Sequence, residues 1–163
     1  MAIKFLNAVI KNEHKVQDSN ILILSIEVCE KFLLWREDGF ELDEPSKVRS
    51  LEVLAEVAQR DESFSQTHIF NRQIMSLATL FLHDTPHKVL LRALRLIGSI
   101  ATSDDDDELL KAVQRDDIFT ELYNLPFINR LLQKLNAGYS VSQNDLDLTK
   151  ELLWCVSNLA ASN

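Results

Sequence analysis

The chain has 163 residues, of which 46% are hydrophobic, with only three glycines and three prolines. This length suffices for one compact domain or a short repeat array, and the scarcity of turn-forming residues disfavours an all-β fold. The net charge of −8 argues against a general nucleic-acid-binding protein, which needs a positive surface, and favours either basic partners or simply solubility.

Hydrophobic residues that recur at three- and four-residue spacings predict eight helices and no strands. The third helix is expected to open at Pro45, because proline is tolerated in a first turn, and Gly39 is expected to stop the second. Four acids at 104–107 precede the sixth helix, where they suit its dipole. The predicted helices span residues 3–10, 20–35, 45–59, 70–82, 88–101, 108–114, 127–136 and 145–161.

Three of these helices share one pattern, which indicates an internal repeat. The copies are SLEVLAEVA (50–58), ALRLIGSIA (93–101) and LLWCVSNLA (152–160), which start 43 and 59 residues apart. The first interval matches armadillo or HEAT units of about 40–47 residues, and the second fits a unit with an insertion near 115–126 or 137–144. A small residue recurs at one site (Ala55, Gly98, Ser157) and should let neighbouring helices approach closely.

The expected architecture is a single all-α domain with approximate units at 1–36, 40–60, 61–103 and 104–163. The segments LRLIGSIAT (94–102) and KELLWCVSNLAAS (150–162) resemble third helices of armadillo repeats in the importin-α family of nuclear-import receptors. The resemblance is best over 69–163. It implies a right-handed α-solenoid that binds extended basic peptides, such as nuclear-localisation segments, in a concave groove. An unrelated helical-hairpin fold is the alternative if the repeat is fortuitous.

The resemblance also implies a peptide-binding role for Trp154 and Asn158, which lie four residues apart on one helix face. The asparagine amide would bond the peptide backbone, and the tryptophan face would hold the stem of a lysine or arginine. Glu151 and Asp147, one and two turns earlier, would attract the basic side chains. Read without the family, Trp154 is a core filler and Asn158 an ordinary helix residue.

The other two copies depart from the family's Trp/Asn pattern. Arg95 and Ser99 take the Trp and Asn places in the middle copy, where Lys88 and Arg92 extend a basic face that should repel a basic peptide. Glu52 and Glu56 occupy these places in the first copy. A structural scaffold, which docks a fixed partner or assembles with itself, is therefore the second functional hypothesis. An armadillo-type third helix at the end of the chain would leave an apolar flank uncovered, so a longer solenoid, self-association through this end or a partner that caps it is expected.

Other chemistry is not expected from this sequence. His83 and His87 flank a turn without a third ligand, and the 104–107 acids lack the spacing of a calcium loop, so neither a metal nor a cofactor is predicted. No nucleophile motif or glycine-rich phosphate loop occurs, which predicts a protein that is not an enzyme. Trp35 is interpreted as a packing residue.

The cellular setting follows from the cysteines and from hydropathy. Cys29 and Cys155 make no disulfide framework, which predicts a reducing compartment, either the cytoplasm, the nucleus or both. The longest apolar stretch, 21–26, is too short to span a bilayer, and no membrane association is expected.

Overall fold

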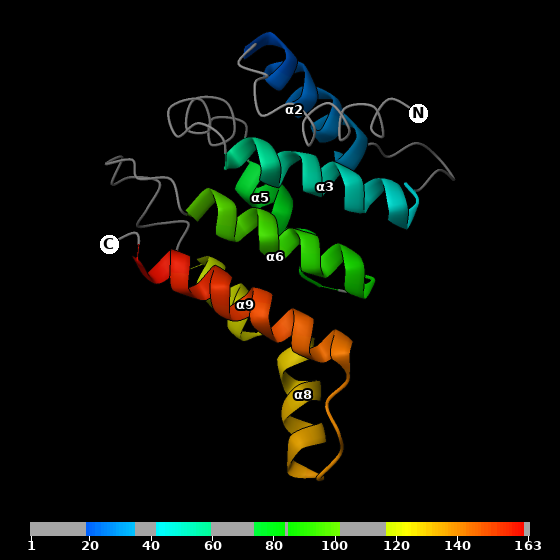
Figure 1. Cartoon of the computed structure of the whole chain (residues 1–163), viewed down its shortest axis with the longest axis vertical. Coiled ribbons are helices and arrows are strands. Elements are labelled where there is room, and N and C mark those ends of the chain that lie inside the picture. Colours follow the sequence, from blue (N-terminus) through cyan, green and yellow to red (C-terminus); the bar gives the residue numbers. More distant parts are fainter. Residues whose placement is uncertain (1–18, 35–41, 60–73, 84, 102–116, 162–163) are drawn as a thin grey trace.

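The computed structural model describes residues 19–34, 42–59, 74–83, 85–101 and 117–161 (Figure 1). All regular structure within these ranges is helical, which confirms the all-α class. Trp35, Gly39 and the predicted segments 3–10 and 104–114 lie outside the described residues. The helices are α2 (Ser19–Leu34), α3 (Glu44–Ala58), α5 (Ile74–Thr79), α6 (His87–Ala101), α8 (Pro126–Asn136) and α9 (Gln143–Ala161), with a further helical stretch at 117–123.

Proline and glycine mark several helix ends. Pro45 lies in the first turn of α3, as predicted, and Pro126 is the first residue of α8. Gly138 follows α8 with φ of 71°, a left-handed conformation that glycine adopts at little cost. Its N–H donates to the Leu135 carbonyl at 3.1 Å, and the Tyr139 N–H donates to the Lys134 carbonyl at 2.9 Å. These bonds form a Schellman motif that ends α8.

One predicted helix was wrong in extent, and one helix was missed. The helix expected over 70–82 ends at Thr79, where the N–H groups of Phe81 and Leu82 bond carbonyls only three residues back. These tight bonds make a turn in place of another α-helical turn. Residues 117–123 are helical although the sequence assigned them to an insertion, and they bury Ile118 and Leu122 on one face.

Helices α3, α6 and α9 lie side by side in one layer (Figure 1). The bond from Gln59 Nε2 to Ser99 Oγ joins α6 to the end of α3, and these residues are 40 apart. Contacts between α6 and α9 join residues 56 to 60 apart along their whole length. In antiparallel helices the sequence separation between contacting residues would change steadily along the interface, so α6 and α9 run in the same direction. Figure 1 shows that α3 runs the same way.

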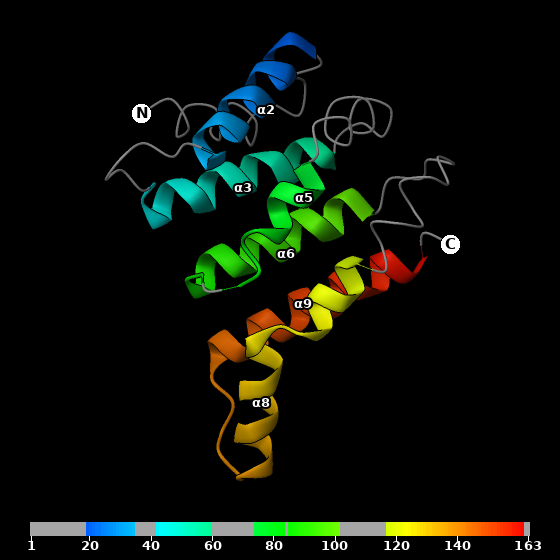
Figure 2. The same cartoon turned by 180° about the vertical axis from the view of Figure 1, so that it is seen from behind.

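The other helices lie on or beyond this layer. Helix α2 packs on α3, and α5 packs on α6 (Figure 2). Helix α8 projects away from the layer beside the N-terminal end of α9 (Figures 1 and 2). The core is apolar, and its largest fully buried side chains are Ile26, Leu33, Leu51, Leu54, Ile74, Leu82, Leu94, Leu96, Ile97 and Ile100.

None of the helices in the described part of the chain combines the length and the apolar character needed to cross a membrane.

Candidate functional site

The predicted Trp154 site lies between α6 and α9, and an arginine of the same chain already occupies it. The guanidinium carbon of Arg95 lies 4.8 Å from the centre of the Trp154 ring, within the range of a cation–π contact. The Arg95 Nη1 also donates to Glu151 Oε1 at 3.2 Å. We call the Trp154 face together with the Glu151 carboxylate the Trp154 slot. The aromatic face and the carboxylate of the Trp154 slot therefore suit a basic side chain, and Arg95 of the same chain provides that side chain.

Gly98 lets α9 approach α6 closely, as the small-residue position predicted. A Cβ atom built on Gly98 would lie 2.4 Å from Trp154 Cζ3 and 3.2 Å from the Cys155 Cα. No side chain fits there without displacing the indole ring. The Asn158 Nδ2 donates to the Gly98 carbonyl at 3.1 Å, so this amide holds the neighbouring helix.

The two remaining predicted site residues lie apart from the slot. Ser99 is fully buried, donates to the Arg95 carbonyl at 2.8 Å and accepts a bond from Gln59 Nε2 at 2.8 Å. Asp147 is partly buried and accepts a bond from Gln143 Nε2 at 2.7 Å. The structure thus brings together Trp154, Glu151, Arg95 and Asn158, while Ser99 joins α3 to α6.

The basic face predicted on α6 is matched by carboxylates of its neighbours. Arg92 Nη2 lies 2.7 Å from Glu52 Oε1 on α3, and Arg95 pairs with Glu151 on α9. The repeat register aligned Glu52 with Arg95, but the ion pair forms one turn earlier, at Arg92. Both arginines thus link neighbouring helices of the layer.

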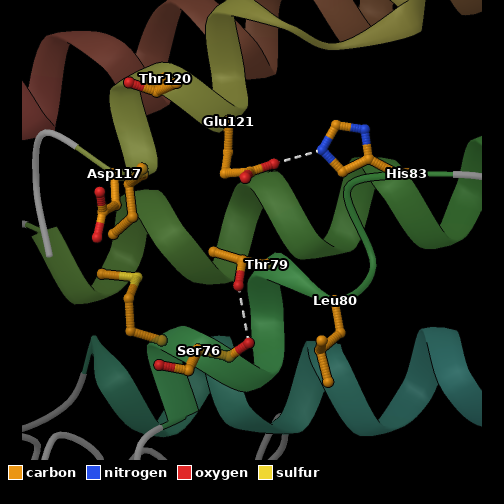
Figure 3. Close-up of a pocket in the computed structure, with 9 residues that line it drawn as sticks. Ser76, Thr79, Leu80, His83, Asp117, Thr120 and Glu121 are labelled. Carbon is orange, nitrogen blue, oxygen red and sulfur yellow. Dashed lines mark hydrogen bonds and ion pairs between the residues drawn. The ribbon is translucent and has the colours of Figure 1, made fainter.

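A cavity of about 560 Å³ with a mixed polar and apolar lining lies between α5 and the 117–123 helix (Figure 3). Its lining includes the polar residues Asp117, Glu121, His83 and Thr79 and the buried residues Met75 and Ile118. The His83 Nε2 lies 2.6 Å from Glu121 Oε2, which ties the turn after α5 to the 117–123 helix. Both side chains are well exposed, so this contact contributes little to stability.

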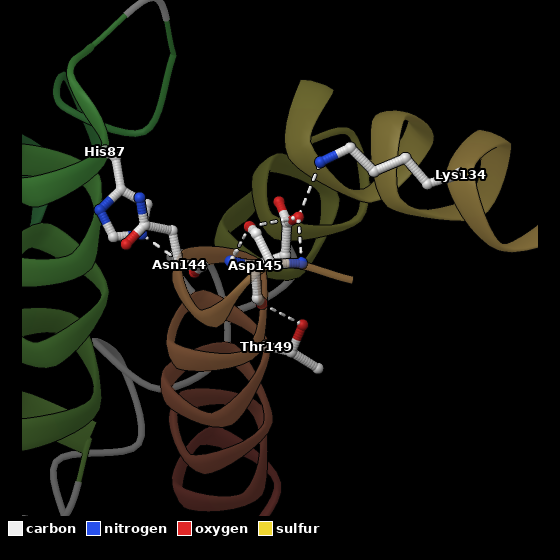
Figure 4. Close-up of polar contacts among 6 residues, drawn as sticks. His87, Lys134, Asn144, Asp145 and Thr149 are labelled. Carbon is white, nitrogen blue, oxygen red and sulfur yellow. Dashed lines mark hydrogen bonds and ion pairs between the residues drawn. The ribbon is translucent and has the colours of Figure 1, made fainter. Parts of the chain in front are cut away.

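The side chains considered for metal binding or nucleophilic chemistry have other roles. His87 Nε2 donates to the Asn144 carbonyl at 3.0 Å and joins the N-terminal ends of α6 and α9 (Figure 4). The described residues contain no group of three His, Cys, Asp or Glu side chains that could hold a metal ion. Burial raises the pKa of both the Cys29 and Cys155 thiols to about 12, so neither forms a reactive thiolate at neutral pH.

A reciprocal cap fixes the start of α9. Asp145 Oδ2 accepts bonds from Ser142 Oγ at 2.7 Å and Ser142 N at 3.2 Å, and the Asp145 N–H donates to Ser142 Oγ at 3.2 Å. The same carboxylate pairs with Lys134 Nζ of α8 at 2.7 Å (Figure 4). Bonding to Lys134, and next to Ser142, lowers the Asp145 pKa from 3.8 to about 2. This one carboxylate therefore caps α9 and attaches α8 to it.

An Asp145→Asn protein should be about 1 kcal/mol less stable than the wild type at pH 7, as for other lost caps. Because folding lowers the Asp145 pKa, its stabilisation is complete above about pH 4 and is lost as the pH falls towards 2. Urea unfolding at several pH values should show the two proteins converging over that interval. Lys134→Gln should remove much of the same pH dependence. A stability difference that is equal at pH 7 and pH 2 would contradict the assignment.

Most of the exposed large apolar side chains lie in the C-terminal part of the described sequence. Six of the nine exposed large hydrophobic residues in the described ranges follow residue 122. We call them the C-terminal surface: Tyr123, Leu132, Leu135, Tyr139, Leu146 and Leu153. Two of them, Tyr123 and Leu153, line a groove of about 490 Å³ between the 117–123 helix, α8 and α9, together with apolar residues such as Phe119, Ile128, Leu152 and Val156.

Comparisons of the chain with protein-family models, with curated proteins and with solved structures find no match.

Proposed function

We propose that the chain is a non-enzymatic protein-binding module of the cytoplasm or nucleus, built as a right-handed armadillo-type solenoid, that acts as a scaffold for a partner protein. The observation that carries the proposal is the layer of α3, α6 and α9, in which lateral contacts join residues 40 apart between α3 and α6 and 56 to 60 apart between α6 and α9. Stacked units of this kind bind other proteins through their extended surfaces. The exposed C-terminal surface supplies apolar area for such a partner.

The scaffold is favoured over a peptide receptor because the only Trp/Asn pair is engaged internally. Arg95 covers Trp154 and pairs with Glu151, while the Asn158 amide bonds the Gly98 carbonyl. An extended peptide would have to displace these contacts before it gained its own. A peptide adaptor of the importin-α type is the second candidate. The contact of Arg95 with the Trp154 slot supports it, because it indicates that the slot suits a basic side chain.

Fluorescence anisotropy with a Lys/Arg-rich peptide tests the choice between these two functions. The matched control is the same sequence made of D-amino acids, which has identical charge but presents a mirror-image backbone. The wild-type protein should bind both peptides weakly and equally, because its charge of −8 attracts each alike. Binding of the L-peptide more than about tenfold tighter, and lost in Asn158→Ala, would overturn the scaffold in favour of the peptide adaptor.

A further inference from the structure

The cavity between α5 and the 117–123 helix has the dimensions of a binding site. Its volume of about 560 Å³ lies within the range of ligand pockets, about 300–1,000 Å³. Its lining comes from α5, from the turn after α5 and from the 117–123 helix. The bond between His83 and Glu121 joins the two walls at one end, and Asp117 lies on the side away from His83 (Figure 3).

The polar lining of this cavity is rich in hydrogen-bond acceptors. Neither a lysine nor an arginine is among its described lining residues. The His83 ring donates to Glu121, because an ionised carboxylate can only accept. The Thr79 hydroxyl donates to the Ser76 carbonyl at 2.8 Å, so its lone pairs are left to accept. A ligand that suits this lining is therefore one that donates hydrogen bonds.

Asp117 is the carboxylate of the cavity that is available to such a ligand. Its side chain makes no hydrogen bond or ion pair with another residue in the described part of the chain, whereas Glu121 is engaged by His83. These two carboxylates lie four residues apart on the same helix, and no lysine or arginine of the described lining offsets their charge. The negative charge favours a donor that is also a cation.

The apolar part of the lining defines the rest of the ligand. Met75 and Ile118 are buried, and Leu80, which lines the same cavity, is 62% exposed. An aliphatic chain that lies in the cavity would cover part of Leu80. Lysine and arginine side chains combine both requirements, because their stems pack along apolar surface while their charged heads reach polar groups.

We propose that this cavity binds a lysine or arginine side chain of a partner protein, with the charged head at Asp117 and the aliphatic stem against Leu80 and Met75. The inference rests on the proposed function as a protein-binding module, which favours a partner's side chain over a free amine of the same chemistry. The cavity is distinct from the Trp154 slot, which Arg95 of the same chain already occupies.

Butylamine has the charge and the four-carbon stem of a lysine side chain, so it tests the cavity without a partner. Nuclear magnetic resonance of the isotope-labelled full chain should show weak, saturable shifts of amide signals in residues 75–80 and 117–121. Asp117→Asn should weaken binding about fivefold, the upper range for an exposed ion pair. Asp43→Asn is the matched control, because Asp43 is an exposed aspartate whose side chain makes no cap bond at the start of α3.

Two smaller comparisons separate the charge of the ligand from its stem. Methylamine has the charge without the stem, and butanol has the stem without the charge, so both should bind more weakly than butylamine. Leu80→Ser should reduce the preference for butylamine over methylamine by about threefold, a little less than the effect of one buried methylene. Leu24→Ser should leave this preference unchanged, because Leu24 is similarly exposed but lies on α2.

A peptide with a single lysine among glycines distinguishes the two sources of the cation. If it shifts the same signals at least as tightly as butylamine, the cavity accepts a partner's side chain. Binding of butylamine alone would overturn that assignment in favour of a free amine. Absence of saturable shifts, shifts centred on Trp154, or equal affinities of Asp117→Asn and Asp43→Asn would overturn the cation site itself. The choice between scaffold and peptide adaptor depends on the mirror-image peptides and on Asn158, so it can fail independently of these titrations.

Discussion

The free energy of unfolding of a Gly98→Val protein is expected to be about 2 kcal/mol lower than that of the wild type, which is the usual effect of overpacking a tight contact. A Cβ atom at this position would lie 2.4 Å from the Trp154 ring and 3.2 Å from the backbone of Cys155. Either the indole must leave Arg95 or α9 must move away from α6. Helix propensity cannot explain such a loss, because valine is slightly more favourable than glycine inside a helix.

Ser157→Val is the matched control, since Ser157 takes the same repeat position on α9 but is exposed. Its stability should change by no more than about 0.5 kcal/mol. In a Trp154→Ala background, the effect of Gly98→Val should fall by about 1 kcal/mol or more, because the main contact of the added side chain is gone. Equal effects of Gly98→Val in both backgrounds, measured by urea unfolding, would show that the valine does not act through Trp154.

An Arg95→Ala protein is expected to gain affinity for a Lys/Arg-rich peptide of about tenfold, corresponding to the upper range of a cation–π contact. The substitution vacates the face of Trp154 and leaves Glu151 available to a ligand's cation. The gain should be larger for the L-peptide than for its mirror image if the peptide backbone also contacts Asn158. Since the Arg95 side chain is 44% exposed, the loss of its ion pair should cost little stability.

Arg92→Ala provides the control for charge, because it removes the same unit of charge one turn away. Arg92 pairs with Glu52 and makes its contact on the α3 side of α6. A general electrostatic effect would raise the affinity of both variants equally, whereas a vacated slot raises only that of Arg95→Ala. Equal anisotropy curves for these two variants would therefore show that Arg95 does not block the site.

The internal repeat was the most informative feature of the sequence, because small residues have few reasons other than close packing to recur at the same position of three helices. It predicted Gly98 as a point of close helix approach, and the indole of Trp154 lies against that glycine. Hydrophobic spacing and proline positions also located α3, α6, α8 and α9 to within about two residues, the usual uncertainty of helix ends.

The internal use of the slot could not be predicted in the same way. The sequence showed Arg95 in the tryptophan place of its own repeat, and this suggested repulsion of a peptide. Whether a long arginine side chain reaches a ring 59 positions later depends on the stagger of α6 against α9, which no local pattern encodes. Similarly, Glu52 pairs with Arg92, which lies one turn before Arg95, the residue that takes the same place in the repeat.

The 117–123 helix was missed, although a signal for it was present. Ile118, Leu122 and Leu125 are separated by four and three positions and are all buried. The interval of 59 residues between the second and third copies of the repeat made the segment look like an insertion. Its acidic character belongs to the face that lines the cavity beside His83.

The order of contacts within the layer determines how the fold comes apart. Helix α6 touches both α3 and α9, whereas α9 packs against α6 at one side of the layer. Within the layer, detachment of α9 breaks only the α6–α9 interface, whereas loss of α6 breaks the interfaces with both α3 and α9, so α9 can open while α3 and α6 remain folded together. Helix α2 likewise makes its main contact with α3 alone. The chain should therefore unfold progressively from its two ends, and α6 is the helix on which cooperativity depends.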